Sequence, residues 1–139
     1  MENKILDTNI LVRLFMQDNQ AQYERALEIL NNADIKAYKL YIPVEVVIEF
    51  EYVLRKVYSV ERSEIAKDLE SIVQTSCIDF IDSKDIKLAI ALYPLLNTDL
   101  VDLILFARSK NLKIGIESFD KDFKKIQKAY ESISNSTLT

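Results

Sequence analysis

Four acidic side chains carry the chemistry that this sequence could perform. Asp7 and Asp120 each follow a short apolar stretch, whereas Glu49 and Asp102 lie in helical patterns with no Lys or Arg three or four positions away. Two carboxylates at ~4 Å repel by roughly 4 kcal/mol at an effective dielectric constant of ~20. If the four acids converge, they must bind protons or a divalent cation. Oxygen ligands without His or Cys favour Mg²⁺ or Mn²⁺.

Taken singly, each of these acids also has an ordinary interpretation. Asp7, Asp102 and Asp120 could be helix caps or turn residues, and Glu49 could be a boundary residue beside the apolar stripe of its helix. Glu51 shows the contrasting pattern, because Arg55 follows it by four positions. This spacing predicts a plain surface ion pair.

Missing residue types exclude several other chemistries. The chain of 139 residues has no histidine, which excludes serine–histidine triads, zinc sites built on His and nucleases with a His base. Its single glycine, Gly115, excludes a P-loop and a glycine-rich dinucleotide loop. Any catalysis must then use carboxylates, hydroxyls, amines or a bound metal.

The composition predicts a globular, cytoplasmic protein. Apolar residues make up 49% of the chain, and the length suffices for a core without disulfides. A lone Cys77 favours a reducing compartment, and we expect neither a signal peptide nor a membrane span. The net charge of −4 is unusual for a nucleic-acid binder, although lysines are concentrated between residues 108 and 128.

Strand and helix patterns alternate along the chain and must position the acids. Apolar stretches predict strands at residues 4–7, 77–81 and 112–116, and the last is followed by a loop and a short basic helix. Helices are predicted at 8–16, 20–33, 43–58, 60–74, 83–96 and 98–111. This order indicates an α/β fold with a parallel sheet, in which ligands bind at the carboxyl ends of the strands. Asp7 and Asp120 should therefore lie at the same edge. We expect one domain over residues 1–129 and a polar, frayed tail over 130–139.

Three sequence blocks together resemble a known family. LDTNILVRLF, VIEFEYVLRKVY and TDLVDLILFARSKN with the later SFDKDF look like a PIN-domain ribonuclease, and they are similar to VapC-type toxins of bacterial type II toxin–antitoxin modules. The resemblance covers almost the whole chain. It implies a three-layer α/β/α sandwich with a mainly parallel central sheet, and a metal-dependent enzyme that cuts RNA.

The resemblance also implies roles for individual residues. The four acids of the family fall, in order, on Asp7, Glu49, Asp102 and Asp120, of which the first and third would bind Mg²⁺ or Mn²⁺ directly. The other two would complete the acidic cluster and could hold a second ion. Supporting roles fall on three further residues: Asn9, Asp99 and Ser118. Asp99 could equally be a helix cap.

Partners follow from the same resemblance. VapC-type toxins usually form homodimers and are held inactive by a cognate antitoxin, so we expect both here, together with an RNA substrate. Basic side chains near the site motifs are candidates for contacting the RNA backbone, although a solvated role is more common for such residues: Arg13, Arg55, Lys121, Lys124 and Lys125.

Two rival functions are open at this stage. Asp7 could be the phosphoacceptor of a haloacid-dehalogenase-like phosphatase, but that chemistry needs a second Asp two residues later, where this chain has Asn9. The chain could also be a PIN-like scaffold that has lost catalysis. The presence of all four acids argues against a scaffold.

Overall fold

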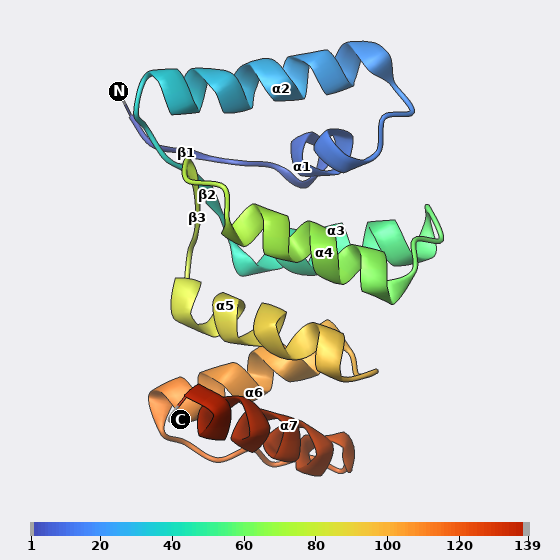
Figure 1. Ribbon diagram of the computed structural model, residues 1–139, viewed down its shortest axis with the longest axis vertical. Helices are drawn as coiled ribbons and strands as arrows, with labels where there is room; N and C mark the ends of the chain where they lie inside the picture. The colour runs from blue at the N-terminus through green and yellow to red at the C-terminus, as the bar shows by residue number, and fades with distance from the viewer. Residues whose placement is uncertain (1, 138–139) are drawn as a thin grey trace. The chain divides into compact units, whose positions relative to one another are not determined.

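A short parallel sheet organises the first part of the chain. The computed structural model describes residues 2–137 (Figure 1). The sheet has the order β1 (Lys4–Ile5), β2 (Leu40–Ile42), β3 (Ile78–Phe80), and both neighbouring pairs are parallel. In β2 and β3 the first and last side chains are buried and the middle one is partly exposed. The predicted α/β class with a parallel sheet is confirmed.

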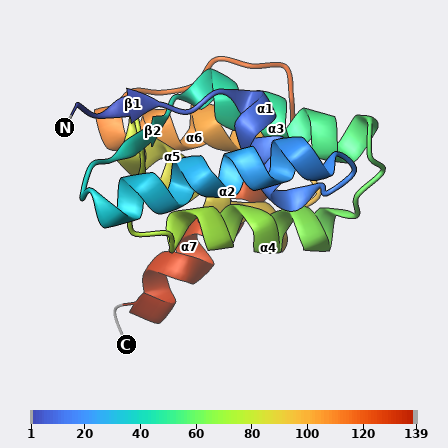
Figure 2. The ribbon, with the colours of Figure 1, turned by 90° about the horizontal axis from the view of Figure 1, so that it is seen from above.

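Helices form the connections between the strands, as parallel pairing requires. The helices α1 (Thr8–Phe15) and α2 (Gln20–Ile35) link β1 to β2, and α3 (Val44–Lys56) and α4 (Arg62–Val73) link β2 to β3. Helix α1 packs beside both α2 and α3, and α3 packs beside α4 (Figure 2). All four helices lie where the apolar periodicity predicts them.

Local sequence signals explain how these helices begin. The Asn19 side chain accepts a hydrogen bond from the Gln22 N–H at 3.1 Å, which caps α2. Pro43 is the N-cap residue of α3, where its extended backbone ends β2 and its missing N–H leaves no bond unmade. The side chain of Phe50 is fully buried on α3 and meets the Phe15 ring edge-to-face at 5.4 Å. This aromatic pair joins α1 to α3.

The strand predictions need two corrections. Strand β2 was not predicted, because LYI is short and runs directly into a helix at Pro43. The strand predicted at 112–116 is wrong. Leu112 ends a helix, Lys113 adopts a left-handed conformation with φ 59°, and the segment after it belongs to no strand within residues 2–137. A left-handed residue closes a helix and turns the chain, so the apolar pattern there marks a helix end and a loop.

The chain divides into two compact units, Met1–Ser83 and Lys84–Thr139. The second unit is helical and contains α5 (Ser83–Leu92, whose first residue ends the first unit), the 3₁₀ turn η1 (Tyr93–Leu95), α6 (Leu100–Leu112) and α7 (Asp122–Thr137). The Phe106 ring on α6 meets the Tyr130 ring on α7 at 5.4 Å. The expected polar tail is therefore helical over residues 130–137, and residues 138–139 lie outside the described part. The domain range 1–129 stays a prediction.

The environment of Glu51 differs from the sequence-based prediction. Arg55 Nε donates to Glu51 Oε2 at 2.9 Å and Arg55 Nη2 donates to Oε1 at 3.3 Å, so the predicted pair exists. The Glu51 side chain, however, is only 5% exposed. The prediction of a plain surface pair is wrong, because spacing along a helix identifies partners but not burial.

Within residues 2–137, no helix combines the length and the apolar character needed to cross a membrane.

Asp68 on α4 gives a prediction on stability. Burial, with a smaller contribution from the charge of Glu64, raises the pKa of Asp68 from 3.8 to about 6. The folded state therefore favours the protonated acid, and this contribution to stability is present at low pH and lost as the pH rises through about 6. A shift of ~2 pKa units would be worth roughly 3 kcal/mol, but solvent screening at this partly exposed site reduces it to about 1 kcal/mol.

Asp68→Asn should thus raise the free energy of unfolding by about 1 kcal/mol at pH 7 and change it little below pH 3.8. Urea unfolding at pH 3.5, 5 and 7 would measure the difference. Glu70→Gln, at an exposed position on the same helix, is the matched control. A destabilised Asp68→Asn protein at pH 7 would contradict the prediction.

Candidate metal centre

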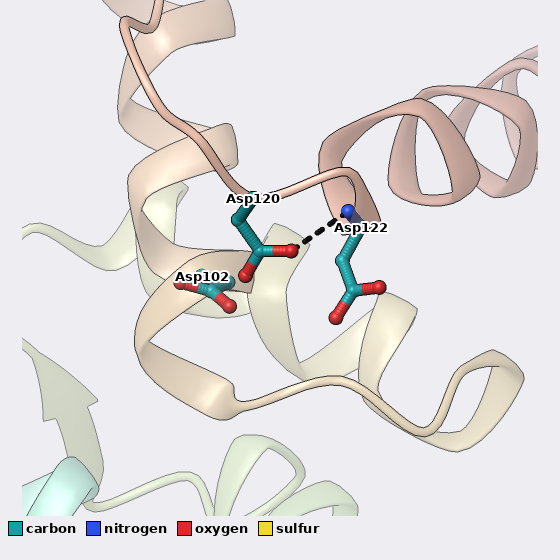
Figure 3. A group of neighbouring side chains, drawn as sticks. All are labelled: Asp102, Asp120 and Asp122. Carbon is teal, nitrogen blue, oxygen red and sulfur yellow. Dashed lines mark hydrogen bonds between the residues drawn. The ribbon is translucent and has the colours of Figure 1, made fainter.

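Three carboxylates come together in the second unit. One oxygen atom from each of Asp102, Asp120 and Asp122 lies within 4.8 Å of the others (Figure 3). Asp102 and Asp122 are partly buried and Asp120 is exposed. The structure thus brings together two of the four acids predicted from the sequence and adds Asp122, which the sequence analysis did not identify.

The start of α6 positions Asp102. The helix begins after Asp99, which is the N-cap residue but whose side chain accepts no capping hydrogen bond. The Asp102 side chain lies in the first turn, where the helix dipole favours an acid. Most other side chains of this turn and the next are buried, including Leu100, Leu103 and Ile104. Asp102 is thus the one acidic side chain in the otherwise apolar first two turns of α6.

Two hydrogen bonds hold the loop that carries Asp120. The Asp120 N–H donates to Ser118 Oγ at 2.9 Å, and the Asp122 N–H donates to Asp120 Oδ1 at 2.9 Å (Figure 3). The second bond uses the Asp120 side chain to pin the first residue of α7. Ser118 and Asp122 therefore fix the backbone on either side of Asp120, whose carboxylate also interacts with Asp102.

The electrostatics of the cluster disfavour three bare charges. Burial raises the pKa of Asp102 above its ordinary value, and the charges of Asp120 and then Asp99 raise it further. Cations compensate the negative charge of the cluster only weakly, because the ion pair between Lys125 Nζ and Asp122 Oδ1, at 3.9 Å, is exposed. Three carboxylate groups and no nitrogen or sulfur donor make a set of ligands that fits a hard divalent cation.

The other two predicted acids lie in the first unit. Asp7 follows β1 as the N-cap residue of α1, where its Oδ1 accepts a hydrogen bond from the Thr8 N–H at 2.8 Å. Glu49 lies on α3, which follows β2, and both acids are exposed. Because β1 and β2 are parallel neighbours, Asp7 and the start of α3 follow carboxyl ends at the same sheet edge. That all four acids form one site stays a prediction.

Comparison with known proteins identifies the family. A model described as the PIN domain matches residues 4–129. The chain belongs to the PIN-domain family. The resemblance carried by the three sequence blocks is therefore confirmed. A curated VapC ribonuclease of Aquifex aeolicus (strain VF5) is 29% identical over 124 residues, which cover 88% of this chain and 91% of that protein.

All the candidate acids lie inside the part of the chain that matches the PIN domain, Asp122 included. The signal that could have identified Asp122 is its spacing, because Asp120 and Asp122 are two residues apart at a helix start and can turn toward one partner. Of the supporting residues, Ser118 bonds to the Asp120 backbone, Asp99 contributes charge beside Asp102, and Asn9 is exposed in the first turn of α1. Their roles in this PIN domain stay predictions.

The five basic side chains that are candidates for contacting RNA differ in the hydrogen bonds and ion pairs that they form. Arg13 donates from Nη1 to Asp18 and Tyr58 and from Nε to Gln22, and Arg55 donates to Glu51. Lys125 is close to Asp122. Lys121 and Lys124 are exposed and form no ion pair with another described residue of this PIN domain.

Proposed function

We propose that this PIN-domain protein is a metal-dependent endoribonuclease and the toxin of a toxin–antitoxin pair. The observation that carries the proposal is the cluster of three carboxylates in a chain whose curated relative is a VapC ribonuclease. Acids within 4.8 Å and without His or Cys suit Mg²⁺ or Mn²⁺. The proposed substrate, an RNA phosphodiester, follows from the ribonuclease relative.

The proposed roles divide among the acids. Asp102 and Asp120 would bind the cation, and Asp122 would supply further negative charge beside them. The assignment of Asp7 and Glu49 to the same chemistry rests on the family match. A divalent cation held by these acids supplies a water of lowered pKa and neutralises charge on the phosphate. The protein's part is to hold these carboxylates in place, and the bond from the Asp120 N–H to Ser118 Oγ does this for the Asp120 loop.

The proposal is tested by cleavage of total RNA with the purified protein. We expect cutting with Mg²⁺ or Mn²⁺, none with EDTA, and a loss of at least about 10²-fold in Asp7→Asn, by comparison with the removal of one group that stabilises a transition-state charge. Cleavage that survives Asp7→Asn would remove this residue from the mechanism. A protein free of any inhibitor that cuts no RNA under any condition would favour the scaffold.

Protein partners belong to the same proposal. As a VapC-like toxin, the protein would form a homodimer and would be held inactive by a cognate antitoxin in the cytoplasm. Copurification with the product of the neighbouring open reading frame would support the antitoxin, and sedimentation would give the oligomeric state. A monomer that binds no such product would count against this part of the proposal.

A further inference from the structure

Phe119 is an aromatic side chain with no protein partner beside the acidic cluster. Its relative exposure is 107%, the value of a side chain that touches nothing. Single exposed apolar residues are common, but this one directly precedes Asp120. Burying a Phe side chain typically stabilises a protein by roughly 1.5–3 kcal/mol, so a ring left in water at this position contributes none of that stabilisation to folding.

The backbone next to Phe119 is held on its C-terminal side. The Asp120 N–H bonds to Ser118 Oγ across the Phe119 position, and Asp120 Oδ1 binds the start of α7. These bonds attach the exposed ring to the same short segment that places Asp120 in the cluster. Consecutive Cα atoms are 3.8 Å apart, so the ring is anchored one residue from a proposed metal ligand.

Two lysines follow Asp120 in the sequence. Lys121 follows it directly and Lys124 lies one turn further along, and both are exposed. Neither forms an ion pair with another described residue. An aromatic face together with free lysines is the combination that binds single-stranded nucleic acid, since the ring stacks on a base and the cations attract phosphates.

We propose that Phe119 is the stacking platform for the RNA base next to the scissile phosphate. The inference rests on the proposed function, because a phosphate bound to a cation held by Asp102 and Asp120 would lie beside the short segment that carries Phe119. Stacking would position the phosphate without choosing a sequence, since every base presents a π-face. Phe119 is thus a positioning residue for the substrate.

Fluorescence tests the stacking directly, because the chain contains no tryptophan. In Phe119→Trp the new indole is the sole tryptophan, and we expect saturable quenching by a mixed-sequence single-stranded RNA oligonucleotide. Ca²⁺ replaces Mg²⁺ in the titration so that the RNA is bound without being cut, since Ca²⁺ binds oxygen ligands in a looser geometry. Ile35→Trp, at a position that is 79% exposed on α2, is the control and should not respond. The inference would be overturned by unchanged Phe119→Trp emission, whether anisotropy shows that the labelled RNA binds or that it does not.

Kinetics provide the second test. Phe119→Ala should raise KM for RNA cleavage by about 10-fold or more with kcat little changed, and Phe119→Tyr should restore KM, because stacking needs only an aromatic face. If the wild type cuts RNA and Phe119→Ala has an unchanged KM, the stacking inference alone is overturned. If the wild type cuts no RNA, the proposed function fails and the fluorescence titration decides the stacking.

The alternative partner for the Phe119 ring is a second copy of the chain. Sedimentation of wild type and Phe119→Ala separates the two cases. A dimer that dissociates in Phe119→Ala, with RNA affinity unchanged, would assign the ring to the protein interface and overturn the proposal. An unchanged oligomeric state with weakened RNA binding is the expected result.

Discussion

Asp102→Asn should lower kcat/KM for RNA cleavage by at least about 10²-fold, the scale of losing one group that stabilises charge in a transition state. Asp102 is the member of the cluster whose pKa is raised by burial and by the neighbouring acids Asp120 and Asp99. The amide keeps the shape of the side chain and removes the charge that would hold a cation. Initial rates on a defined RNA, with Mg²⁺ varied, measure the loss.

The same Asp102→Asn substitution that lowers activity should not lower the stability of the protein. Without metal, the Asp102 charge is repelled by its neighbours, so Asp102→Asn should leave the melting temperature in EDTA unchanged or higher. Glu131→Gln makes the same charge change at an exposed position of α7 and should keep wild-type activity. A folded Asp102→Asn protein with wild-type kcat/KM at saturating Mg²⁺ would exclude Asp102 as a ligand.

Phe50→Ala should lower the free energy of unfolding by about 3–5 kcal/mol, a typical loss for a Phe removed from a core. The ring is fully buried and contacts Phe15, so its removal leaves a cavity between α1 and α3. A domain is stable by only about 5–15 kcal/mol, so the loss is a large fraction of the total. Urea unfolding at 25 °C, with the slope m fixed from the wild type, measures it.

Tyr52→Ala is the matched control for Phe50→Ala. Tyr52 is an aromatic residue on the same helix, 53% exposed, and its ring lies 5.8 Å from the Arg55 guanidinium carbon. Its removal should change the free energy of unfolding by less than about 1 kcal/mol. If Phe50→Ala and Tyr52→Ala lower the free energy of unfolding equally, either the Phe50 site collapses around the cavity or α3 is packed differently.

Helix positions could be predicted from the sequence because the signals are local. Periodic apolar residues, the Asn19 cap and Pro43 act within one or two turns, and α2 and α3 lie where these signals place them. Strands depend on a distant partner, so the sequence-based prediction located β1 and β3 but was wrong elsewhere. It missed β2, whose three residues pair with β1 and β3, and it placed a strand at 112–116, where Lys113 closes a helix.

For the candidate site, too, some features could be predicted from the sequence and others depended on the tertiary structure. The residue types by themselves determined that any metal would be held by oxygen, because the chain has no His and a single Cys. The motif blocks pointed to the family and to Asp102 and Asp120. Only the tertiary structure decided that Asp122 joins them, that Glu51 is buried and that Phe119 is left in solvent. Spacing along a chain specifies neighbours within a helix turn, whereas burial and convergence depend on side chains that approach from other elements.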